Sequence, residues 1–225
     1  MKKVIGFLTD IYHNNDRNWF EAHKDEYKAA LAEFNAFAEK LIEGIGRFDP
    51  SVRGLTLKDC TYRIYRDVRF SPDKRPYKTH MGVYVCPGGK KSGNAGYYFH
   101  VEPRTDSGGA VYFLTTGLYM PEPKVLKSVR DELFDNGEGF LATVKKAKGW
   151  RMNQDNKLKR TPVGYPAGSS MDEYLKLKDV CLEQFFDEAT LLREDLAEWA
   201  AGEFKKTFEF NALLNKSVDF AREEM

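Results

Sequence analysis

The sequence lacks the residue patterns of several protein classes. It has three cysteines among 225 residues, and these lie far apart with no Cys-x-x-Cys pair. This spacing argues against a zinc ribbon or a redox dithiol, so we expect three buried, reduced thiols. The formal net charge is only +1, with 35 Lys and Arg against 34 Asp and Glu. That balance excludes a histone-like polycation and an acidic disordered chain.

Long apolar segments are absent as well. The longest charge-free run, residues 107–121, contains Gly108, Gly109 and Pro121 and is shorter than the ~18 residues of a membrane helix. The apolar stretch near the N-terminus is too short for a signal-peptide core of ~7–15 residues. We therefore expect a cytoplasmic protein that makes no contact with a membrane.

Aromatic residues, in contrast, are abundant. The chain holds 16 Phe, 12 Tyr and 3 Trp, which together make 14% of its residues. Because each aromatic side chain buries a large area, this composition predicts a packed core and excludes a disordered chain. The length suits one large domain or two small ones. No internal repeat or low-complexity linker divides the sequence, which favours one domain over residues 1–225.

Hydrophobic periodicity predicts helices at both ends of the chain and strands between them. Residues 1–48 are expected to form N-terminal helices, with a turn at residues 14–16. Residues 58–117 alternate between apolar and polar in runs at 62–68, 81–85, 97–101 and 111–113, separated by turns. Residues 122–225 are expected to be mostly helical, with no strand from residue 171 onward. The predicted fold class is α+β: a single domain with an antiparallel meander of about four strands between helical segments.

The charge is distributed unevenly along the chain. Residues 58–80 carry a net charge of +4 and residues 124–160 a net charge of +5, whereas residues 182–225 carry −6. A protein with one positive side would attract anions. Alternatively, the acidic C-terminal helices pair with the two basic segments and neutralise them.

Residues 62–80 contain most of the candidate site residues. In a strand here, Arg63, Tyr65 and Asp67 would lie on one face, and a basic turn would follow. Arg binds phosphate or carboxylate through paired hydrogen bonds, and Lys acts as a point charge, so this segment is a candidate anion site. The candidate anion-binding residues are Arg63, Arg66, Arg69, Lys74, Lys78 and, from the second basic segment, Arg160. The candidate acid–base residues are Asp67, His100 and Tyr65.

The same segment resembles the signature of a known family. It reads Arg63-Ile64-x-Arg66-Asp67-x-Arg69-Phe70-Ser71-x-Asp73-Lys74-x-Pro76-Tyr77-Lys78-Thr79. With Trp19-Phe20, Gly96-Tyr97-Tyr98 and Gly117-Leu118-Tyr119-x-Pro121, it is similar to a broad family of uncharacterised bacterial proteins, domain of unknown function 2461. The resemblance covers almost the whole chain and implies a single-domain protein of this length. It implies no activity, cofactor or catalytic residue.

Other short motifs point to no cofactor. His100 and Glu102 have the spacing of two ligands on one strand face, but no Pro-Cys-x-x-Cys or His-Glu-x-x-His motif accompanies them. We therefore expect no bound metal, and a His100 that is hydrogen-bonded beside Tyr98. Several tyrosines are predicted to lie on the polar face of the sheet: Tyr65, Tyr84, Tyr98 and Tyr112.

These observations leave three hypotheses open. In the first, the polar sheet face and the basic turn bind an anionic small molecule, and whether the protein is an enzyme stays undecided. In the second, the same basic residues bind the phosphates of a nucleic acid while tyrosines stack on its bases. In the third, the basic cluster is a salt-bridged scaffold, and the protein acts through a protein partner. The sequence does not decide the oligomeric state.

Overall fold

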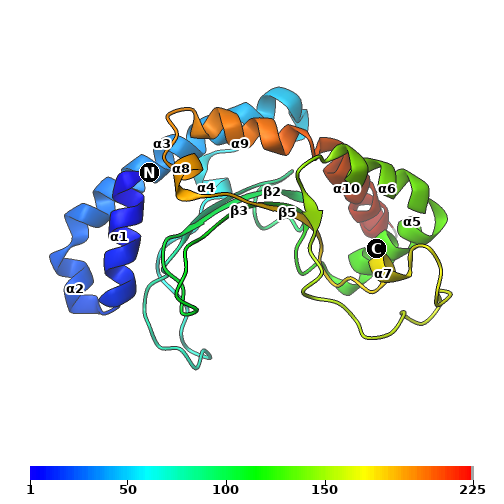
Figure 1. The fold of residues 1–225 in the computed structure, drawn as a ribbon, viewed down its shortest axis with the longest axis horizontal. Helices are drawn as coiled ribbons and strands as arrows, with labels where there is room; N and C mark the ends of the chain where they lie inside the picture. Colours follow the sequence, from blue (N-terminus) through cyan, green and yellow to red (C-terminus); the bar gives the residue numbers. More distant parts are fainter. Residues whose placement is uncertain (224–225) are drawn as a thin grey trace.

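A curved antiparallel sheet forms the centre of the fold (Figure 1), with its strands in the order β1-β2-β3-β5-β4. The computed structural model describes residues 1–223. The strands are β1 (Met81–Val85), β2 (Gly96–Glu102), β3 (Val111–Leu118), β4 (Arg151–Met152) and β5 (Val180–Phe185). The predicted α+β fold class is confirmed, although the sheet has five strands where about four were expected.

Helices precede and follow the strands in the chain. The N-terminal helices are α1 (Lys2–His13), α2 (Arg17–Ala22), α3 (Lys24–Phe48), the 3-10 helix η1 (Pro50–Val52) and α4 (Leu57–Cys60). The later helices are α5 (Pro123–Asp135), α6 (Gly137–Lys146), α7 (Asp172–Leu175), α8 (Glu188–Leu191), α9 (Leu196–Lys205) and α10 (Phe208–Glu223). No helix in residues 1–223 is long and apolar enough to cross a membrane.

The two faces of the sheet have different surroundings. Figure 1 shows α3, α9 and α10 along its convex side, whereas no helix of the described chain crosses its concave side. Period-two alternation in β2 divides the side chains between these faces. Phe99 and Tyr97 point toward the helices, where their rings lie 4.5 Å from Phe37 and 5.4 Å from Phe204. The intervening residues of β2 therefore lie on the concave face.

Strand pairing extends this concave face sideways. Tyr84 of β1 pairs with Tyr98 of β2, and Phe113 of β3 pairs with His100. Tyr84 and Tyr98 thus lie on the polar face, as predicted. The prediction is wrong for Tyr112, which points to the helical side and stacks on Phe186 at 6.1 Å.

The N-terminal helices follow the predicted pattern. Between α1 and α2, Asp16 caps α2 by accepting hydrogen bonds from the backbone N–H groups of Asn18 and Trp19. The expected start of the later helices near residue 122 is also confirmed. Helix α5 begins at Pro123, where the missing N–H of proline costs no hydrogen bond.

The predicted strand at residues 62–68 is wrong. Residues 62–78, the basic arm, form an irregular loop with two limbs that are joined by an isolated bridge between Tyr65 and Tyr77. Prolines 72 and 76 lack the N–H that a regular ladder needs. Arg63, Tyr65 and Asp67 therefore do not share a strand face.

The expectation of helix from residue 171 onward is wrong for β5. This strand inserts between β3 and β4 and buries Leu182 under the helices. Its sequence lacks clear alternation, so periodicity alone did not separate it from the helices on either side. Gly117 of β3 has a φ of 118°, and a Cβ there would lie 2.1 Å from the carbonyl oxygen of Val180. Only glycine permits this approach of β3 to β5.

Candidate functional site

Two histidines and a glutamate converge at the β1 side of the concave sheet face. Met81 pairs with Val101 in the antiparallel register, which places His80 opposite Glu102, while His100 lies two residues along the same face. The Nε2 atom of His100 lies 3.4 Å from Oε2 of Glu102, and the His80 and His100 rings are 4.9 Å apart. We call His80, His100 and Glu102 the histidine cluster.

Neighbouring side chains hold the histidine cluster in place. As expected, His100 is hydrogen-bonded to Tyr98, with Nδ1 and the phenol oxygen 2.9 Å apart. The ring of His100 stacks on Phe113 at a centroid distance of 4.6 Å, and this residue is only 8% exposed. The hydroxyl group of Thr79 donates a hydrogen bond of 2.7 Å to Oε1 of Glu102. The orientations of His100 and Glu102 are thus set by partners outside the cluster.

Burial and nearby charges fix the protonation states in this cluster. Burial, followed by the effect of His100, lowers the pKa of His80 to about 4, and the cations Lys78 and Arg66 contribute to the decrease. Burial alone would raise the pKa of Glu102, but hydrogen bonds from His100 and Thr79 lower it. At neutral pH, His80 is therefore a neutral imidazole and Glu102 a carboxylate.

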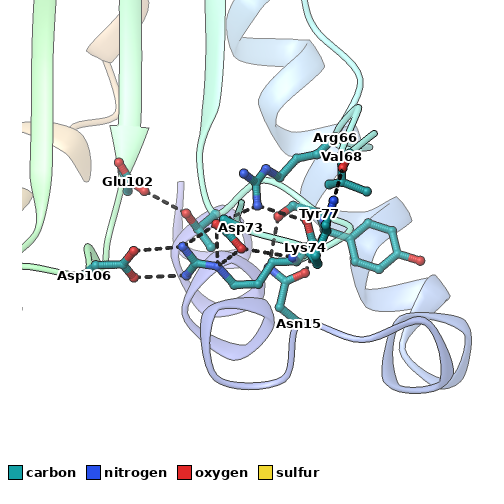
Figure 2. A network of polar contacts seen from close by, with 10 residues as sticks. Asn15, Arg66, Val68, Asp73, Lys74, Tyr77, Glu102 and Asp106 are labelled. Atoms are coloured by element: carbon teal, nitrogen blue, oxygen red, sulfur yellow. Dashed lines mark hydrogen bonds and ion pairs between the residues drawn. The ribbon is translucent and has the colours of Figure 1, made fainter. Parts of the chain in front are cut away.

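The basic arm contains an internal ion-pair network (Figure 2). Nη1 of Arg66 donates to Asp73 at 2.7 Å and to the carbonyl oxygen of Arg75 at 3.0 Å. Arg75 also binds Asp73, and it forms a two-pronged pair with Asp106 of the β2–β3 loop at 3.0 and 2.8 Å. Most of the hydrogen-bonding capacity of Arg75 is thereby used within the protein. Arg66 and Arg75 connect the two limbs of the arm with the next loop.

Two more candidates from the arm also have partners there. Arg69 donates to both carboxylate oxygens of Asp67, at 3.0 and 2.7 Å. These hydrogen bonds lower the pKa of Asp67, which makes this carboxylate a weaker base at neutral pH. The ammonium group of Lys74 donates to the carbonyl oxygen of Val68 at 3.0 Å.

Tyr65 packs toward the N-terminal helices. Its ring lies 5.4 Å from Tyr77 and 5.8 Å from Phe20 of α2, and Tyr77 itself stacks on Phe20 at 4.1 Å. These contacts give the Tyr65 ring a packing role at the base of the arm, whereas His100 faces the concave side of the sheet.

Lys78 differs from the other cations of the arm. Its side chain is half-buried, with Nζ 5.3 Å from the centre of the Tyr62 ring. Burial, with a contribution from Arg63, lowers the pKa of Lys78. Among residues 1–223, neither Lys78 nor Arg63 forms an ion pair with a carboxylate. The charges of these two cations are therefore not neutralised by a carboxylate within the described chain.

Comparison with known proteins places the chain in a family. The profile of a family described as "Conserved hypothetical protein (DUF2461)" matches residues 3–212, which include the basic arm and the histidine cluster. The chain belongs to the DUF2461 family. No curated protein and no solved structure matches this DUF2461 protein.

The structure does not bring Arg160 of the DUF2461 protein to the basic arm. Arg160 is exposed in the segment that follows β4, whereas the arm precedes β1, and these strands form opposite ends of the sheet (Figure 1). The concave face of the sheet separates the two regions. Arg160 and Lys78 therefore do not form one cradle in the DUF2461 protein.

Sequence reasoning missed His80 in the DUF2461 protein. The sequence shows His100 and Glu102 at a two-residue spacing, but it does not show which residue lies across from them. The register of β1 against β2 supplies that information. Alternation through Gly82 and Tyr84 places His80 on the same face, which is the one signal in the sequence that could have pointed to it.

Proposed function

We propose that this DUF2461 protein is a cytoplasmic protein that binds a small anionic molecule, a phosphate or a carboxylate. The ligand binds to Lys78 and Arg63 of the basic arm, next to the imidazoles of His80 and His100. The observation that carries this proposal is the half-buried Lys78, which has another cation beside it and no carboxylate partner among the described residues.

This arrangement of charges favours an external anion. Removing a charge from water costs free energy unless a partner of opposite charge compensates for it. Three other arginines of the arm have such partners: Arg66 pairs with Asp73, Arg69 with Asp67, and Arg75 with Asp106. Lys78 and Arg63 instead raise the positive potential of their surroundings. A phosphate or carboxylate would relieve this repulsion and accept charge-assisted hydrogen bonds.

The cations of the arm fall into two groups in this proposal. Arg66 and Arg75 build the scaffold, since they are held by Asp73 and Asp106. Lys78 and Arg63 contact the ligand. This division joins the anion hypothesis to the scaffold hypothesis, with each applying to different residues of the same segment.

An enzymatic role would use the histidine cluster beside the bound anion. An anion bound beside His80 would offset the cations that help to lower its pKa, so that its neutral imidazole could accept a proton. Tyr98 and His100 form a hydrogen-bonded pair on the same sheet face. In this proposal His80 replaces Asp67 and Tyr65 as a candidate acid–base group, while His100 keeps its candidate acid–base role.

The test uses inorganic phosphate as the probe and isothermal titration calorimetry on the chelator-treated full chain. The Lys78→Met variant keeps most of the aliphatic packing and removes the charge, so we expect about tenfold or more weaker binding. Lys40→Met, on the exposed side of α3, is the matched control and should bind as the wild type does. Phosphate binding that is equal in the wild type and Lys78→Met would overturn the proposal.

The nucleic-acid hypothesis has one supporting feature, the 95% exposed Phe70 beside Arg69 at the end of the arm. Against it, some cations of the second basic segment are already paired: Lys127 with Asp131, Lys146 with Glu209, and Arg151 with Glu183. A titration with single-stranded DNA at two salt concentrations separates the two functions. Tight binding that weakens steeply with salt would favour nucleic acid over the small anion.

A further inference from the structure

We propose that His80, His100 and Glu102 form a binding site for a divalent transition-metal ion of the zinc type. The inference comes from the juxtaposition of two imidazoles and one carboxylate on the concave sheet face. It departs from the expectation of no metal, because the sequence pattern contained only two of the three ligands. It does not depend on the proposed anion function.

The donor atoms are close to the spacing that a metal requires. Tetrahedral zinc has bonds of about 2.0–2.1 Å to nitrogen and oxygen, so neighbouring ligand atoms are about 3.3 Å apart. Nε2 of His100 and Oε2 of Glu102 lie 3.4 Å apart, and all three donor atoms lie within 4.8 Å of one another. His80 precedes β1 and is outside the regular ladder. A small rotation of its side chain completes the site.

Two of the proposed ligands already have hydrogen-bonding partners of the kind that orient metal ligands without touching the metal. A metal-bound histidine usually bonds to a partner through its second ring nitrogen, which fixes the ring and its tautomer. Tyr98 provides this partner, with its phenol oxygen 2.9 Å from Nδ1 of His100. In the tautomer that carries its proton on Nδ1, this nitrogen donates to Tyr98, and Nε2 exchanges its contact with Glu102 for the metal. Thr79 binds Oε1 of Glu102 at 2.7 Å, which leaves Oε2 for the metal.

The donor set also indicates the class of ion. Imidazole suits zinc, copper, nickel and iron, whereas magnesium and calcium prefer all-oxygen sites. The cluster contains no thiolate, and three protein ligands leave at least one coordination position for water or substrate. The chain has only four histidines, and two of them meet here. This pattern is that of a catalytic type of zinc site, since structural sites use four protein ligands.

Nearby cations reduce the attraction for a metal ion but do not remove it. Arg66 and Lys78 lie close enough to His80 to disfavour a positive charge there, while Glu102 supplies one negative charge within the cluster. Asp73 compensates Arg66 through a 2.7 Å ion pair. The effect of Lys78 would be offset by an anion bound jointly to Lys78 and the open metal position.

The competing explanation is structural. His100 stacks on Phe113 and bonds to Tyr98, so these residues could simply pack the sheet face without binding an ion. In that case, the cluster would show no preference for a metal over other histidines of the chain. The exposed His13 in the last turn of α1 serves as the reference.

The test measures uptake of Zn²⁺ and Co²⁺ by the full chain after chelator treatment, in phosphate-free buffer, by calorimetry and visible absorption. We expect one ion per chain and, for Co²⁺, a visible spectrum of low coordination number. His80→Ala and Glu102→Gln should each weaken binding by about tenfold or more, since a lost ligand costs at least as much as a lost outer partner. His13→Ala should leave the affinity unchanged.

Each outcome decides the proposal. No uptake at millimolar metal overturns it, as does uptake that His80→Ala and Glu102→Gln leave unaltered. Circular dichroism of the metal-free variants checks that they fold, and the position of His80 outside the regular ladder makes His80→Ala the safer of the two. Phosphate binding by the chelated protein without metal uptake would overturn this inference alone, and metal uptake without phosphate binding would overturn only the proposed function.

Discussion

Asn15 exchanges two hydrogen bonds of 3.0 Å with the main chain of Tyr77, donating from Nδ2 to the carbonyl oxygen and accepting the N–H at Oδ1. The side-chain amide thus imitates a neighbouring strand at the base of the basic arm (Figure 2). Through this contact, the turn between α1 and α2 positions the limb that continues to Lys78 and His80. The N-terminal helices thereby help to place both proposed sites.

Replacing Asn15 with alanine should loosen the arm. The variant leaves the N–H and carbonyl groups of Tyr77 without their partner, so we expect a loss of about 1–3 kcal/mol in the free energy of unfolding. Urea denaturation measures this loss, and hydrogen exchange should show reduced protection of the Tyr77 amide. Asn14→Ala is the control, because the Asn14 side chain only bonds to the carbonyl oxygen of Asp10 on the surface. Equal stability of the two variants would contradict the prediction.

A second prediction concerns the hydrogen bond from the Tyr97 hydroxyl to Asp49 Oδ2, at 2.9 Å beneath the helical layer. Tyr97→Phe removes the donor from a carboxylate that is only 6% exposed. Hydrogen bonds to charged groups contribute about 1.5–3 kcal/mol, so the free energy of unfolding should fall by that amount. Tyr112→Phe is the matched control, since its hydroxyl is 3.5 Å from Glu188. Its stability should change by less than about 0.5 kcal/mol.

A third prediction tests the packing of Tyr98 on Gly82. A Cβ at Gly82 would lie 2.4 Å from the Tyr98 hydroxyl oxygen and 2.7 Å from its ring. Gly82→Ala should therefore displace Tyr98 from His100 and lower the free energy of unfolding by about 1–3 kcal/mol. Urea denaturation and the NMR signals of the His100 ring measure the two effects.

The control for this variant lies in α1. Gly6 is exposed and has nothing within 4 Å of its would-be Cβ. Gly6→Ala should stabilise the protein by about 0.5–1 kcal/mol, because alanine favours a helix interior. A Gly82→Ala variant that keeps the His100 signals and the wild-type stability would show that the sheet face tolerates a side chain there.

A fourth prediction concerns the three cysteines, which are all buried and unpaired, as expected from the sequence. Burial raises the pKa of the Cys60 thiol to about 12 and also raises those of Cys86 and Cys181. The reagent DTNB at pH 8 should therefore label the folded protein only as fast as it unfolds, and label all three thiols in denaturant. Rapid labelling of the folded chain would contradict this burial.

The same shift has a consequence for stability. A thiol whose folded pKa is raised contributes stability that is present below its unfolded pKa of about 8.5 and is lost as the pH rises above it. The free energy of unfolding should therefore decline between about pH 8.5 and 12. Cys60→Ala should make this decline shallower in urea denaturation. An identical slope would show that Cys60 does not contribute to it.

Local sequence signals predicted the elements that depend on nearby residues. The expected turn at residues 14–16 and the expected start of helix near residue 122 are both confirmed, because Asp16 caps α2 and Pro123 begins α5. Alternation located the central strands, including β2 with Tyr98 and His100 on its polar face. The prediction of a strand at residues 62–68 failed because alternation does not supply a pairing partner, and two prolines prevent a regular ladder with the residues that follow.

The sequence by itself determined the α+β fold class, the buried thiols, and the concentration of cations in residues 62–78. Only the tertiary structure decided which of these cations are paired, because Asp106 reaches Arg75 from a distant loop. It also decided the histidine cluster, since the antiparallel register brings His80 opposite Glu102. Periodicity is a property of one segment, whereas strand register and ion pairing depend on which separate segments become neighbours in the folded chain. Local sequence patterns do not show those neighbours.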